Sequence, residues 1–182
     1  MAVVLRRMTS DEFLGVSWPD TVELELSGGE IRVLTKPGPE HQLIVLRLAE
    51  LLRAYCRATG WGEVFLDTLV KLDPYTSRAP DLSLVRADRR ELVGKARLEG
   101  PPDVAIEVHS ENRAEDEGPK FEEYLRAGIS CYWMIDPLSR SLHAYRLQEG
   151  RYVLEWQGRD HEVFSPSGLP GFALPLSRLW SD

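Results

Sequence analysis

Cysteine, long apolar runs and positive charge are all in short supply in this chain of 182 residues. Its two cysteines, Cys56 and Cys131, have neither CxxC spacing nor a histidine cluster beside them, which argues against a zinc site. Cys56 falls in an apolar helical pattern and Cys131 opens an apolar strand pattern, so we expect both in the core. The apolar runs are far shorter than the roughly 20 residues that a membrane-spanning helix needs, and the N-terminus lacks the order of a secretory signal. We therefore expect a cytoplasmic protein with no membrane partner.

The shortage of positive charge gives a formal net charge of −7. This argues against a highly basic nucleic-acid coat protein, because affinity for nucleic acid comes largely from Lys and Arg neutralising phosphates. It does not exclude a nuclease, since a local basic face can coexist with an acidic remainder. A polar connection holds a basic cluster that is either a solvated surface or a track for a nucleic-acid backbone: Arg86, Arg89, Arg90, Lys95 and Arg97.

Hydrophobic periodicity predicts one domain over residues 1–182 with a mixed order of helices and strands. An α/β or α+β mixed sheet with helices packed on it fits this order, with an N-terminal hairpin and a C-terminal β-meander. The predicted helices are 8–14, 40–58 and 119–127, with a further short one around Glu91. The predicted strands are 22–26, 30–34, 63–66, 69–72, 82–85, 103–109, 131–135, 142–147, 152–156 and 162–164.

The predicted strand 103–109 carries the first sign of a functional site. Side chains alternate along a strand, so Val104, Ile106 and Val108 face one way, whereas Glu107 and His109 face the other. A carboxylate in the middle of an apolar strand is costly unless it is paired or binds a cation. Glu107 is therefore a candidate ligand, with His109 on the same face.

The second sign is Asp81, which opens an apolar strand directly after Pro80. If its strand neighbours the strand of Glu107, the two carboxylates can converge on one ion. Together with a backbone carbonyl, that of Val108, and water, they supply the oxygen ligands that Mg²⁺ or Mn²⁺ prefers. A metal there could activate water against a phosphodiester. Lys120 or His109 would supply a cation near the attacked phosphate.

These residues resemble the PD-(D/E)xK nuclease motif, and more of the chain resembles one branch, the Uma2-like (DUF820) endonucleases. The resemblance extends from about Met8 to Leu179 and is carried by ordered motifs rather than by the short acidic pattern alone. These are Glu40-His-Gln, Pro80-Asp-Leu-Ser-Leu-Val, Pro102-Asp-Val-Ala-Ile-Glu-Val-His-Ser-Glu-Asn, Lys120-Phe-Glu-Glu-Tyr-Leu-Arg-Ala-Gly-Ile-Ser-Cys-Tyr-Trp-Met-Ile-Asp-Pro and Leu169-Pro-Gly-Phe.

The resemblance implies a restriction endonuclease-like core and a metal-dependent endonuclease that hydrolyses phosphodiester bonds in DNA, working as a homodimer. It implies that Asp81 and Glu107 are metal ligands and that Lys120 is a catalytic lysine moved onto a helix. It also suggests that His41, in the first turn of the long helix, approaches the site. Position 109 departs from the pattern, because a histidine stands where lysine is usual.

Each candidate also has a structural interpretation, and the sequence leaves both open. Glu107 could form a buried salt bridge to Arg113 or Lys120. Lys120 could instead pair with Glu117 or Glu123 on the surface of its helix. Asp81 could simply be a turn residue after proline, and the two histidines could be hydrogen-bonded structural residues.

Two rival hypotheses therefore stand beside the endonuclease. The histidine at position 109 motivates the first, a catalytically impaired nuclease-fold protein that binds nucleic acid or a protein partner. The second is an oligomeric structural protein whose apolar C-terminal meander forms the interface.

Overall fold

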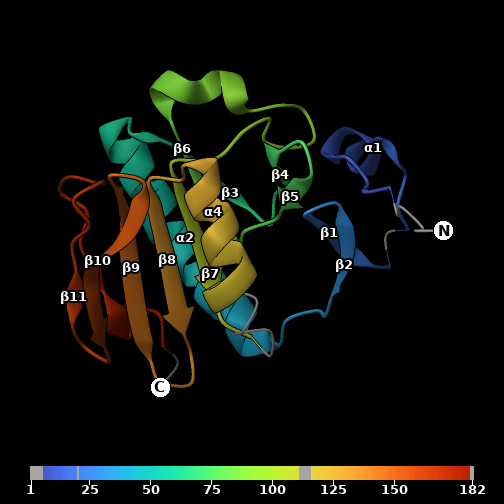
Figure 1. Ribbon diagram of the computed structural model, residues 1–182. Coiled ribbons are helices and arrows are strands. Elements are labelled where there is room, and N and C mark those ends of the chain that lie inside the picture. Colours follow the sequence, from blue (N-terminus) through green and yellow to red (C-terminus); the bar gives the residue numbers. More distant parts are fainter. Residues whose placement is uncertain (1–5, 20, 111–115, 181–182) are drawn as a thin grey trace.

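A six-stranded mixed sheet lies at the centre of the protein, for which a computed structural model describes residues 6–19, 21–110 and 116–180 (Figure 1). Its strand order is β10-β9-β8-β7-β6-β3. The neighbours β7 and β8 are parallel, and the other neighbouring pairs are antiparallel. The strands are β3 (Gly62–Leu66), β6 (Leu82–Arg86), β7 (Val104–Val108), β8 (Cys131–Asp136), β9 (Ser141–Gln148) and β10 (Arg151–Arg159).

Helices cover both faces of this sheet, α2 (Pro39–Thr59) behind it and α4 (Phe121–Ala127) in front of it in Figure 1. Proline in the first turn of α2 supplies a pre-set φ, and Gly60 ends the helix with a φ of 70° that glycine adopts without strain. The two faces of β7 pack against different helices. Ile106 lies in one core cluster with residues of α2, and Ala105 lies in a second cluster with Tyr124 of α4.

A smaller antiparallel sheet lies beside the central one, with strand order β2-β1-β5-β4. The short helix α1 (Ser10–Gly15) lies next to it (Figure 1) and begins with a capping box between Thr9 and Glu12. The strands of this smaller sheet are β1 (Glu23–Ser27), β2 (Glu30–Leu34), β4 (Val70–Asp73) and β5 (Thr76–Arg78). The remaining elements are β11 (Val163–Phe164), β12 (Leu174–Pro175), the 3-10 helices η1 (Ala87–Leu92) and η3 (Leu176–Arg178), and the π-helical turn η2 (Asp116–Lys120).

The predicted hairpin, long helix and mixed sheet are confirmed, and both cysteines are buried. The prediction for the C-terminal meander is partly wrong. β9 and β10 continue the central sheet from β8, but the third predicted strand, 162–164, pairs with β12 instead. The helix predicted from residue 119 begins as the π-helical turn η2. Among the described residues, no helix is long and apolar enough to cross a membrane.

Candidate active site at the end of the central sheet

Asp81 and Glu107 lie beside each other at one end of the central sheet. β6 and β7 are antiparallel, with Leu82 opposite Ile106 and Ser83 opposite Ala105. Continued by one residue, this register places Asp81 opposite Glu107, and opposite residues in antiparallel strands have their Cβ atoms about 4.5–5.5 Å apart. Both residues line one hollow of about 150 Å³. The topology therefore brings together two acids that are far apart in the chain.

The carboxylate of Asp81 is held from two sides through one oxygen. Its Oδ2 accepts a hydrogen bond from the backbone N–H of Val108 at 2.7 Å and lies 3.1 Å from Nε2 of His41. His41 comes from the first turn of α2 and is buried. Neither contact uses Oδ1, and 22% of the Asp81 side chain is exposed. Asp81 is thus oriented by the protein and still faces the hollow.

Glu107 is buried, and donors from η2 and from α4 contact its carboxylate. Its Oε1 accepts a hydrogen bond from the hydroxyl of Tyr124 at 2.6 Å and lies 2.9 Å from Nζ of Lys120. Burial, and then the neighbouring Glu107 carboxylate, raise the pKa of Tyr124 well above its ordinary value, so the hydroxyl remains a donor. Lys120 ends η2 and is itself buried.

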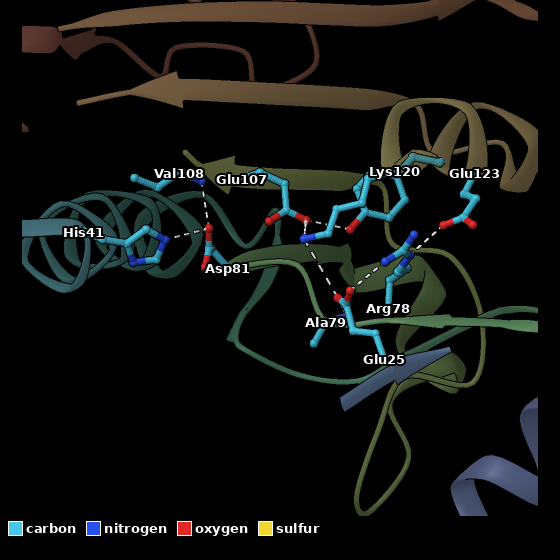
Figure 2. A network of polar contacts seen from close by, with 10 residues as sticks. Glu25, His41, Arg78, Ala79, Asp81, Glu107, Val108, Lys120 and Glu123 are labelled. Carbon is cyan, nitrogen blue, oxygen red and sulfur yellow. Dashed lines mark hydrogen bonds and ion pairs between the residues drawn. The ribbon is translucent and has the colours of Figure 1, made fainter. Parts of the chain in front are cut away.

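On the side of Lys120 away from Asp81, a second group of charged side chains connects the site to the smaller sheet (Figure 2). Arg78 is fully buried, and its guanidinium donates to Glu25 at 2.7 Å and to Glu123 at 2.6 Å. Burial lowers the pKa of Arg78, but the two carboxylates outweigh burial and raise it above its ordinary value. Glu25 also lies 3.8 Å from Nζ of Lys120. Lys120 therefore stands between Glu107 and Glu25.

Asp67 is a further acid in the lining of the hollow. Its backbone N–H donates to the carbonyl of Asp81 at 3.2 Å. Burial, followed by the negative charges of Glu23, Asp81 and Glu25, raises the pKa of Asp67, and Lys120 partly opposes this. Carboxylates therefore gather at the hollow, and a cation bound there would oppose their mutual repulsion.

The donor set fits a hard divalent cation better than zinc. Mg²⁺ is commonly held by one or two carboxylates and keeps several waters, whereas zinc prefers three or four nitrogen and sulfur ligands. In the described part of the chain, no three His, Cys, Asp or Glu side chains are clustered as a metal site. Negative groups nevertheless outnumber the permanent cations in the network of Figure 2. Its carboxylates are those of Glu25, Asp81, Glu107 and Glu123, and its permanent cations are Arg78 and Lys120. His41 is charged only when protonated.

Of the residues that the sequence singles out, Asp81, Glu107, Lys120, His41 and Val108 all line this hollow. His109 is buried at the end of β7, where its backbone N–H donates to the carbonyl of Ile135, and it is not among the residues that line the hollow. The salt bridge between Glu107 and Lys120, which the sequence left open, is present in the structure. The other partner considered, Arg113, lies outside the described residues.

Members of the predicted basic cluster differ in their contacts, and Arg86 pairs with Asp88 at 2.8 Å. Arg89 pairs with Asp103 at 2.9 Å, at the start of β7, and Arg97 pairs with Glu99 at 3.1 Å. Three further neighbours of the site, Glu25, Arg78 and Asp67, are marked by no local sequence pattern. Their place beside the site is set by contacts with residues far away in the chain, such as that between Arg78 and Glu25.

The chain has a restriction endonuclease-like fold: it superimposes with a TM-score of 0.76 on a crystal structure described as "a putative nuclease belonging to DUF820", from Anabaena variabilis. The two are 20% identical, and the match covers 94% of this chain and 97% of the other. The family model "Uma2: Putative restriction endonuclease" matches residues 11–177, so the chain belongs to the Uma2 family. A search of curated proteins found no match.

Proposed function

We propose that this protein is a Mg²⁺- or Mn²⁺-dependent endonuclease that hydrolyses phosphodiester bonds in DNA. The observation that supports it most directly is the alignment of Asp81 with Glu107 across β6 and β7, in a hollow that Lys120 also lines. The description of the family as a restriction endonuclease supports DNA as the substrate. The homodimer and the single domain remain predictions, which sedimentation and limited proteolysis would test.

The proposed ligands are the carboxylates of Asp81 and Glu107 and the carbonyl of Val108. The N–H of His109 points at β8, where it binds the carbonyl of Ile135. Across a planar trans peptide the preceding carbonyl points the opposite way, so the carbonyl of Val108 is directed toward Asp81. A bound divalent cation would lower the pKa of a coordinated water and offset negative charge at the phosphate.

The remaining side chains would orient the ligands and bind the substrate. Hydrogen bonding from His41 fixes the carboxylate of Asp81, in the way that neighbours of metal ligands commonly do. Lys120 lies 2.9 Å from Glu107, and its ammonium would stabilise the phosphate next to the metal. Glu25, on the far side of Lys120, would hold this ammonium when Glu107 turns to the metal. His109 does not line the hollow, so we assign it no role there.

Calorimetric titration with Mn²⁺ tests the metal site. We expect wild type to bind one ion and the Asp81→Ala, Glu107→Ala double variant to lose at least tenfold in affinity. The matched control is Glu50→Ala, Glu91→Ala, which removes two exposed carboxylates outside the hollow. Equal, weak binding to all three proteins would exclude the site.

Cleavage of supercoiled plasmid with Mn²⁺ tests the activity. We expect nicking by wild type and by the Glu50→Ala, Glu91→Ala control, and none by the double variant at Asp81 and Glu107. Nicking that survives in that variant would come from a contaminant. Metal binding without any nicking would support the alternative, a nuclease-fold protein that binds nucleic acid or a partner without cutting.

A further inference from the structure

A second hollow, of about 440 Å³, lies at the opposite end of α2 and β6 from Asp81. His41 is near the start of α2 and Arg57 is near its end, which at 1.5 Å per residue separates them by about 24 Å. Asp81 precedes β6 and Arg86 ends it, so they lie about 17 Å apart along the strand. The second hollow is therefore distinct from the candidate active site.

Four arginines from three different elements line this second hollow. Arg53 and Arg57 are one helical turn apart on α2, Arg86 ends β6, and Arg90 lies in η1. Glu63 is the acid among the lining residues. For a chain with a net charge of −7, four guanidinium groups around one hollow are a marked local reversal of charge.

Three of these arginines have no ion-pair partner in the part of the chain that the structure describes. Arg86 is held by Asp88, with contacts of 2.8 and 3.1 Å. For Arg53, Arg57 and Arg90, no carboxylate of the described residues lies within ion-pair distance. Arg126 and Arg151, exposed elsewhere, are likewise without an ion-pair partner among the described residues, so it is the gathering of arginines at one hollow that distinguishes this group. The guanidinium groups of Arg53, Arg57 and Arg90 therefore remain available for an anion.

The lining residues and the volume of the hollow indicate the class of anion that it would bind. A guanidinium is a planar fork that binds phosphate through two parallel hydrogen bonds and also stacks on flat rings. The lining also includes Cys56, Val64, Val85 and Val93, so apolar side chains line the same hollow as the charged ones. The volume is within the range of small-ligand pockets. These features fit a molecule with both a phosphate group and a flat apolar part.

We propose that this arginine pocket, formed by Arg53, Arg57, Arg86 and Arg90, binds a small phosphate-bearing ligand of nucleotide size. The proposal does not depend on the endonuclease function, because the two hollows share no lining residue. A strand of nucleic acid offers the same phosphate chemistry, but a concave pocket of this size favours a separate small molecule. Binding of a nucleic-acid strand is therefore a separate outcome that the test must distinguish.

Calorimetric titration with inorganic pyrophosphate and with ADP, in EDTA, tests the arginine pocket. We expect both probes to bind wild type and the Arg53→Gln, Arg57→Gln variant to lose at least tenfold in affinity. The matched control is Arg126→Gln, Arg151→Gln, which removes two exposed arginines elsewhere and changes the net charge equally. Thermal melting of each variant checks the fold, which should be retained because all four side chains are exposed.

The outcomes separate the pocket from its rivals. Retained affinity in the control and in Asp81→Ala, with loss only in Arg53→Gln, Arg57→Gln, supports the proposal. Equal weakening in both arginine pairs would show bulk electrostatics and overturn it, as would loss in Asp81→Ala or no binding to wild type at millimolar probe. Binding of a single-stranded oligonucleotide but of neither small probe, lost in the same variant, would also overturn it in favour of a nucleic-acid surface.

Discussion

The candidate active site has two halves that differ in how their charges are balanced. The closed half consists of Glu25, Arg78 and Glu123, where every charge is buried and meets an opposite charge within 2.7 Å. The open half consists of His41, Asp67 and Asp81, where carboxylates face a hollow. A buried ion that is fully paired serves the fold, whereas an excess of one sign beside a hollow is a sign of function. Substitutions in the closed half should therefore affect stability most.

The largest effect is expected from Arg78→Ala in the closed half. It leaves the carboxylates of Glu25 and Glu123 buried without their common partner, which should lower the free energy of unfolding by about 3–5 kcal/mol. Urea denaturation measures this change. Arg32→Ala is the control on the same small sheet, because Arg32 pairs with Glu30 at the exposed surface and should cost below about 1 kcal/mol. Similar losses in both variants would contradict the distinction between the halves.

An intermediate effect is expected from Tyr124→Phe, at the boundary between the halves. The substitution removes a buried donor to the Glu107 carboxylate and should cost about 1.5–3 kcal/mol, the range for hydrogen bonds to charged groups. In Tyr152→Phe the lost hydrogen bond goes to the neutral carbonyl of Ile129, so about 0.5–1.5 kcal/mol is expected. If Tyr152→Phe proves the more costly in urea, Glu107 is not the charged acceptor that we describe.

The smallest effect is expected from Asp67→Asn in the open half, and it has the opposite sign. Burial raises the pKa of Asp67 in the folded protein, so the native state binds this proton more tightly than the unfolded chain. The free energy of unfolding then falls as pH rises through that pKa. Asp67→Asn should be more stable than wild type at neutral pH, by below about 1 kcal/mol, because the residue lies partly in solvent, which screens its charge.

Unfolding at several pH values checks this prediction. The advantage of Asp67→Asn should disappear near about pH 3, where the carboxyl is protonated in both states. Asp160→Asn controls for the same change at another exposed aspartate with positive φ. A variant that is less stable than wild type at neutral pH would show that the Asp67 carboxylate is not under electrostatic strain.

Asp81 and His41 of the open half, and Glu107 beside them, were predictable from sequence because their signals are local, whereas Asp67 was not. Alternation along β7 separates Glu107 from the apolar face, and Asp81 follows a proline at the start of an apolar strand. Their convergence needed one further assumption, that β6 and β7 are neighbours, and the structure shows this pairing. The long helix that carries His41 also followed from its periodicity.

The closed half could not be predicted, because its contacts are long-range and its strand is atypical. β5 is only Thr76-Ser-Arg78, three polar residues that are all buried. Arg78 bonds to Glu25, 53 positions away, and to Glu123, 45 positions away. Neither glutamate differs locally from a surface residue. Similarly, β12 contains a proline and only two residues, so no periodicity indicated that it would pair with β11.

The most direct test is a crystal structure of the protein soaked in Mn²⁺, with anomalous scattering to locate the ion. We predict one peak between Asp81 and Glu107, about 2.1 Å from a carboxylate oxygen of each, with the carbonyl of Val108 directed at it. A peak elsewhere, or no peak while Lys120 remains on Glu107, would contradict the metal site on which the proposed function depends.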